Sequence, residues 1–154
     1  AWKVWEESLA LARETQAPLL VVMTLGCMGG QDLRLGRLGA AAERHEAALA
    51  LALEHGMRYV ELQNRIWLGR ARVRLGSIAE AGRLLREADV ALRESGDTPA
   101  LRFELALARC ELELAVGEVE RAGTSLAEAD GITAGRCPNY QRDQRNWLRE
   151  RLAA

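Results

Sequence analysis

The sequence is poor in the residues that mark membrane, secreted or nucleic-acid-binding proteins. Of its 154 residues only 5% are aromatic, three are cysteines and three are prolines, and the formal net charge is −1. This balance of charge gives no reason to expect nucleic acid or an acidic membrane surface as a partner. The longest apolar run, from Leu19 to Leu25 with Thr24 inside it, is far shorter than the ~20 residues of a membrane helix.

The cysteines are too few and too far apart to suggest a disulfide framework or a metal site. They number three, no C-x-x-C pair occurs, and each is isolated in the sequence: Cys27, Cys110 and Cys137. The chain also shows no secretory leader, so we expect a reduced, cytoplasmic compartment. No cofactor or metal is expected.

Three segments of the chain repeat one pattern of small residues. Each begins at a turn glycine, and these glycines are 40 and 41 residues apart: Gly36, Gly76 and Gly117. Alanines follow five and twelve residues after each glycine: Ala41, Ala48, Ala81, Ala88, Ala122 and Ala129. Between them, nine residues after the glycine, stand His45, Leu85 and Leu126. A period near 40 residues predicts stacked helical hairpins.

Prolines and further glycines set the helix boundaries. A proline opens a helix at no loss of hydrogen bonding, and three stand at the repeat phase: Pro18, Pro99 and Pro138. Glycines favour helix ends, and three fall where second helices should stop: Gly56, Gly96 and Gly135. We expect first helices near 18–35, 58–75 and 99–116, and second helices near 38–55, 78–95 and 119–134. Two more helices are expected near 1–15 and 139–152.

The predicted fold is all-α, a right-handed solenoid of antiparallel helix hairpins with about eight helices and no β-sheet. We expect one domain with three full repeats between two half repeats, at 1–16, about 17–56, 57–96 and 97–136, and 137–154. Because a repeat buries its apolar face only against its neighbours, the half repeats predict that this chain is a fragment of a larger protein.

These residues resemble the tetratricopeptide repeat (TPR). That family has the turn glycine, the two alanines, and a small residue seven positions before the glycine, here Gly29, Gly69 and Cys110. The chain departs from the family in its longer period and in having Leu or His at the aromatic position. The resemblance covers nearly the whole chain and implies a concave groove lined by the first helix of each hairpin.

The long period and the Ala-, Leu- and Arg-rich composition are similar to helical arrays in large bacterial signalling and transcription regulators. This resemblance implies a non-catalytic interaction or scaffold module that binds a peptide or partner domain in the groove. The alternative is a small-molecule effector-sensing domain of a LuxR-type ATP-binding transcriptional regulator. The flanking sequence of the larger protein would distinguish these two readings.

The resemblance also places particular residues in the groove. Carried over by distance from the turn glycine, the candidate partner-binding residues are Arg34, Gln63, Trp67, Arg70, Arg74, Glu104 and Glu111, with Gly30, Ile66, Leu107 and Ala108 beside them. An Arg/Trp patch next to a Glu patch could hold a peptide that carries both charges. Solvated helix faces and a packing role for Trp67 remain the alternatives.

No motif indicates catalysis. The glycine-rich stretch at 26–30 lacks the Gly-Lys-Ser/Thr of a phosphate loop, so we expect it to mark close contact between helices. His45 occupies a core position and is predicted to be a packed histidine, which would make its unit pH-sensitive if buried. No serine or paired carboxylate has a catalytic setting. We predict that the chain is not an enzyme.

The first helix carries more apolar residues than its own unit can cover. Trp2, Trp5 and Leu9 lie within it, and no companion helix precedes them. Burying one large apolar side chain is worth roughly 1.5–3 kcal/mol. We therefore expect the isolated chain to form a homodimer through this helix, or else the helix to shift and hide its tryptophans.

Overall fold

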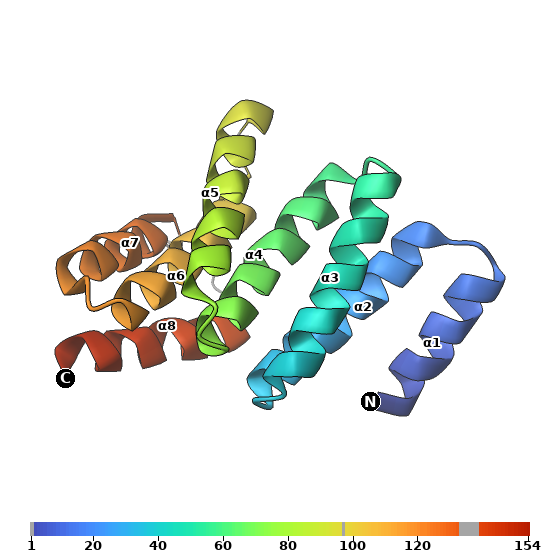
Figure 1. Ribbon diagram of the computed structural model, residues 1–154, viewed down its shortest axis with the longest axis horizontal. Helices are drawn as coiled ribbons and strands as arrows, with labels where there is room; N and C mark the ends of the chain where they lie inside the picture. Colours follow the sequence, from blue (N-terminus) through green and yellow to red (C-terminus); the bar gives the residue numbers. More distant parts are fainter. Residues whose placement is uncertain (1, 97, 133–138) are drawn as a thin grey trace.

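The computed structural model describes residues 2–96, 98–132 and 139–154, apart from the side chains of 139–141. Over these residues the chain is all-α, with eight helices and no strand (Figure 1). The helices are α1 (Trp2–Glu14), α2 (Pro18–Arg34), α3 (Leu38–Glu54), α4 (Arg58–Arg74), α5 (Ile78–Ser95), α6 (Pro99–Ala115), α7 (Val119–Ile132) and α8 (Asn139–Ala153). The all-α prediction is confirmed, and within the described residues the helices match the expected ranges to within a few residues.

From α1 to α7, each turn between helices has a left-handed residue that ends the helix before it. Gly36 has φ +73°; its N–H donates to the carbonyl of Leu33, and the next N–H, of Arg37, donates to Asp32. This pair of bonds satisfies carbonyls that the helix end leaves free. Other left-handed residues stand at the ends of helices along the chain: Gln16, Gly56, Gly76, Gly96 and Gly117. The turn glycines therefore act as the repeat pattern predicts.

The helices stack in chain order, as in a solenoid. Each described helix packs on the next, and the first helices of successive hairpins also touch, α2 with α4, α4 with α6 and α6 with α8. Among the described residues the second helices α3, α5 and α7 do not contact one another. One surface of the array is thus built from α2, α4, α6 and α8, and we call it the inner face. No helix in the described part is long and apolar enough to cross a membrane.

In the core of each hairpin, a small residue on the first helix packs against a larger residue on the second helix. A Cβ built on Gly29 would lie 2.8 Å from Nε2 of His45, and one built on Gly69 would lie 2.7 Å from Cδ2 of Leu85. In the third unit, Cys110 and Leu126 share one buried cluster. These are the small residues and core positions singled out by the repeat, so the glycines mark close helix contacts as expected. Cys137, Pro138 and Gly135 lie outside the described residues.

Candidate functional site

Five of the seven predicted groove residues form one network between α4 and α6. At its centre Nε of Arg70 lies 3.3 Å from a carboxylate oxygen of Glu111, and the two side chains are 4% and 5% exposed. Arg74 binds the second oxygen of the same carboxylate. Burial lowers the pKa of Arg70, and Glu111 opposes that effect by favouring the charged guanidinium.

Trp67 belongs to the same network and is held on several sides. Its indole N–H donates to Glu104 over 2.8 Å. The Arg70 guanidinium lies 4.6 Å from its ring centre, and the His45 imidazole stacks on it with ring centres 6.0 Å apart. Cation–π contacts of this kind are worth about 0.5–2 kcal/mol, the larger values being for desolvated pairs. We call Trp67, Arg70, Arg74, Glu104 and Glu111 the ion-paired half of the inner face.

Arg34 and Gln63, the other two predicted groove residues, stand outside this network. Arg34 is exposed at the end of α2, and it has no ion-pair partner among the described residues. Gln63 is half-buried on α4. Both side chains line an open cavity of about 620 Å³, which we call the hollow.

The hollow lies between α1, α2 and α4 and is mostly apolar and aromatic. Its walls are Trp5, Val22, Met23, Gly26, Cys27, Gly30, Gln31, Arg34, His45, Tyr59, Val60, Gln63, Asn64 and Trp67. The space exists because α2 carries small side chains here. Cys27 and Gly30 occupy the repeat positions at which α4 has the large side chains of Trp67 and Arg70. A Cβ on Gly30 would lie 3.7 Å from the Trp67 ring, an ordinary contact distance.

His45 forms part of the hollow's wall, and it is 1% exposed. Its Nδ1 lies 2.9 Å from Oδ1 of Asn64, whose amide nitrogen donates to the Val60 carbonyl. Oδ1 is therefore the acceptor and Nδ1 carries the proton, while Nε2 has no hydrogen-bond partner. Burial lowers the pKa of His45 to about 4, so the ring is neutral at pH 7. The prediction of a packed core histidine is confirmed; its partner Asn64 was not anticipated.

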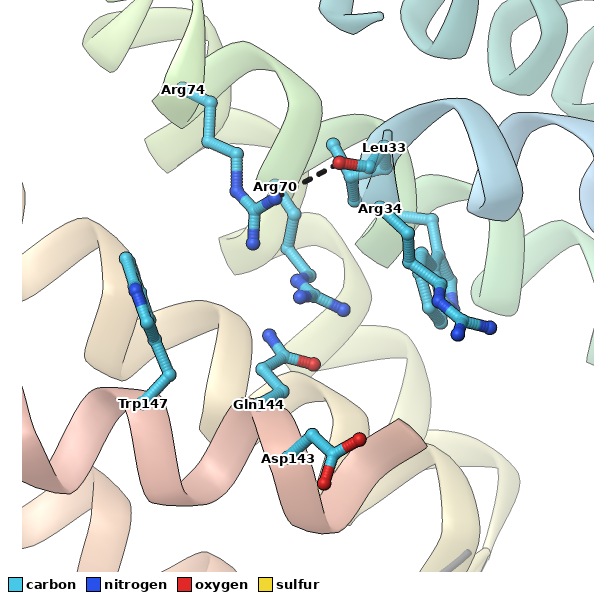
Figure 2. Close-up of a pocket in the computed structure, with 8 residues that line it drawn as sticks. Leu33, Arg34, Arg70, Arg74, Asp143, Gln144 and Trp147 are labelled. Carbon is cyan, nitrogen blue, oxygen red and sulfur yellow. Dashed lines mark hydrogen bonds between the residues drawn. The ribbon is translucent and has the colours of Figure 1, made fainter. Parts of the chain in front are cut away.

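A second cavity, of about 350 Å³, opens where α8 approaches α2 and α4 (Figure 2). We call it the polar cavity; it is lined by Leu33, Arg34, Trp67, Arg70, Arg74, Asp143, Gln144 and Trp147. These α8 residues were not among the predicted groove residues. A signal for them existed, because the spacing of Pro99 and Pro138 gives Trp147 the repeat position of Trp67.

The three residues predicted to drive self-association are half-buried within the chain. Trp2 lies under the guanidinium of Arg44, 4.7 Å from the ring centre, and its ring meets Trp5 edge-on at 5.6 Å. Trp5 lines the hollow, and Leu9 packs on the cluster of α1, α2 and α3. The exposed apolar side chains of α1 are instead Val4 and Leu11. Self-association through α1 stays a prediction.

No protein-family model matches the chain, and neither a curated protein nor a solved structure matches it. The similarity to TPR arrays therefore rests on the spacing of small residues and on the order of helix contacts. Within the described part no group of three or more His, Cys, Asp or Glu side chains is placed to hold a metal ion. The site consists of the hollow, the polar cavity and the ion-paired half that adjoins them.

Proposed function

We propose that the chain is a non-catalytic binding module of a larger regulatory protein and that its inner face holds a segment of a partner protein. The observation that carries this proposal is the hollow, a mostly apolar cavity of about 620 Å³ on the inner face. Cavities of this size and lining are typical of ligand sites. The hollow takes one bulky apolar side chain of the partner segment.

The partner segment is anchored at the hollow rather than at the ion-paired half. Arg70 and Arg74 already share the carboxylate of Glu111, and Trp67 already donates to Glu104. A peptide with both charges would have to break these buried contacts, whose loss costs more than a surface ion pair returns. We therefore assign the ion-paired half a structural role that supports Trp67 as one wall of the hollow.

The test fills the hollow with a substitution that leaves every charged residue unchanged. Gly30→Leu places a branched side chain against Trp67, whereas Gly30→Ala adds one methyl group at a distance that the wall accepts. Peptides selected from a displayed random library on the wild-type chain are then titrated against both variants by fluorescence anisotropy. We expect shared bulky apolar residues in these peptides and about tenfold or greater weakening by Gly30→Leu only.

Equal affinity of the selected peptides for the wild type and for Gly30→Leu would overturn the assignment to the hollow. Both variants are checked by circular dichroism and urea unfolding, so that lost affinity is not confused with lost structure. Alanine variants of Arg70 and Arg74 are poor reporters here, because they leave the buried Glu111 without its partners.

A second candidate, a small-molecule effector site, is favoured by the same hollow. The cavity is lined largely by side chains of two neighbouring helices, α2 and α4, and it ends where the ion-paired half begins. A bounded cavity suits a compact ligand as well as a side chain of a partner. A metabolite that raises the melting temperature of the wild type, but not of Gly30→Leu, would support this candidate.

A further inference from the structure

The polar cavity adjoins the hollow and has different chemistry. The two cavities share two lining residues, Arg34 and Trp67, so one ligand can occupy both. The hollow contributes aromatic and aliphatic walls, whereas the polar cavity contributes guanidinium and amide groups. A ligand that fills both must therefore have an apolar part joined to a polar one.

The polar cavity contains donors without acceptors. Nε2 of Gln144 is buried and has no hydrogen-bond partner. Arg34 has no carboxylate partner among the described residues, and the bond from Arg70 to Glu111 is made by Nε. Figure 2 shows the side chains of Arg70 and Gln144 directed toward one another across the cavity. A buried N–H donor such as that of Gln144 calls for an acceptor that the chain itself does not supply, and the guanidinium of Arg34 is free to bind the same acceptor.

One guanidinium at the polar cavity has no carboxylate paired with it. Three arginines line the cavity, Arg34, Arg70 and Arg74, and the acidic lining residue is Asp143. Behind them Glu111 pairs with Arg70 and Arg74, and Glu104 also favours the charged form of Arg70. Arg34 is the arginine left without an ion pair among the described residues. In Figure 2 the Asp143 carboxylate is turned away from Arg70. A carboxylate on a ligand would give Arg34 the ion-pair partner that it lacks.

We propose that the two cavities form one site for a small organic acid. Its carboxylate accepts hydrogen bonds from Arg34 and Gln144 in the polar cavity, and its apolar or aromatic body lies against Trp67 in the hollow. A carboxylate, with its single charge, matches the one guanidinium without an ion pair, whereas a phosphate carries about −1.5 to −2 at pH 7. This inference rests on the second candidate function, in which the hollow binds a small molecule.

The experiment compares two probes of nearly the same shape, the charged 4-phenylbutanoate and the neutral 4-phenylbutanamide. Each is titrated into the chain by calorimetry, and the Trp67 indole N–H signal is followed by NMR. We expect the acid to bind about tenfold more tightly than the amide, the ratio that one charge-assisted hydrogen bond typically supplies. Arg34→Gln should bring the acid down to the affinity of the amide, and Gln144→Leu should weaken the acid several-fold.

Arg93→Gln is the matched control, because Arg93 is exposed on α5 and lines neither cavity. It should leave both affinities unchanged. Acid and amide binding equally, no binding of the acid at 10 mM (about the weakest affinity of interest), or an unchanged acid-to-amide ratio in Arg34→Gln would overturn the inference. If peptides selected on the hollow still bind and lose affinity in Gly30→Leu, the partner-binding function stands although the acid site fails.

Discussion

Two neighbouring regions of the inner face have the same arrangement of helices, but side chains fill the gap in one region and leave a cavity in the other. Between α4 and α6 the gap is occupied by the half-buried Trp67 and by the buried side chains of Arg70, Glu104 and Glu111, which contact one another. Between α2 and α4 the equivalent positions on α2 are Cys27 and Gly30, and a cavity of about 620 Å³ remains. Helix spacing is set by the small residues of the core, and the side chains on the inner face decide whether a space is closed or open.

The comparison also separates stability from binding. A closed, ion-paired gap depends on every partner, because a buried charge left alone is costly. An open gap loses little when one wall residue changes. Substitutions in the ion-paired half should therefore act on unfolding, and substitutions around the hollow should act on ligands.

The largest expected effect is in the ion-paired half. Glu111→Ala leaves Arg70 buried without its carboxylate, and we expect a loss of about 3–5 kcal/mol in the free energy of unfolding, measured with urea. Glu118→Ala, which removes an exposed ion pair with Arg121, is the control and should cost less than about 1 kcal/mol. Similar values for the two variants would show that the network does not hold this half together.

The next effect concerns pH in the open half. Because the pKa of His45 falls from 6.5 in the unfolded chain to about 4 in the folded one, the unfolded chain binds more protons between these values. Stability is therefore lost as the pH falls from 7 toward 4, by about 1.4 kcal/mol per pH unit and roughly 3 kcal/mol in all. Urea unfolding of His45→Leu should lack this slope, and parallel curves for the two proteins would contradict the assignment.

Two adjacent glycines on α2 allow a tight helix contact to be compared with a loose one: Gly29 packs against His45 in the core, and Gly30 borders the hollow. Gly29→Ala forces a methyl group to within 3 Å of the rigid His45 ring and should destabilise the chain by about 1–3 kcal/mol. Gly30→Ala meets Trp67 at ordinary contact distance and should stabilise it by up to about 1 kcal/mol through helix propensity. Thermal unfolding of the two variants gives the comparison; effects of the same sign would mean that the helix contact is misplaced.

The smallest effect on stability is expected at Arg34. This side chain is exposed and has no ion pair among the described residues, so Arg34→Gln should change the free energy of unfolding by less than about 0.5 kcal/mol. A loss above 1 kcal/mol in urea unfolding would reveal a structural role and would disqualify the variant as a reporter of binding.

The helices could be predicted from the sequence because their signals are local and repeated. Each turn glycine adopts a left-handed conformation, and each core alanine or glycine lies where two helices touch. The pairing of Arg70 with Glu111 was also within reach, since the two occupy the same repeat position in successive units and the helices that bear them are in contact. Both residues were predicted to lie in the groove, but as parts of two separate patches that face a ligand.

The polar cavity could not be predicted in this way. Its shape depends on where α8 lies relative to α2 and α4. That position results from the small rotations between successive hairpins added together, and no local sequence pattern encodes their total. The bond between His45 and Asn64 is similarly a property of packing, because a histidine at a position that is Leu85 or Leu126 elsewhere has no fixed partner in the sequence.

The left-handed turn residues at 16, 36, 56, 76 and 96 are twenty residues apart, and the next, Gly117, follows after twenty-one, so the two helices of a hairpin occupy nearly equal lengths of chain. A segment of forty residues between alternate turns, from Gly36 to Gly76 for instance, has a left-handed glycine and the same pair of backbone hydrogen bonds at both ends. Such a segment can be duplicated without redesigning a junction. Duplication of a unit in this way would lengthen the array while α2 and α4, the two helices that bound the hollow, stay next to each other.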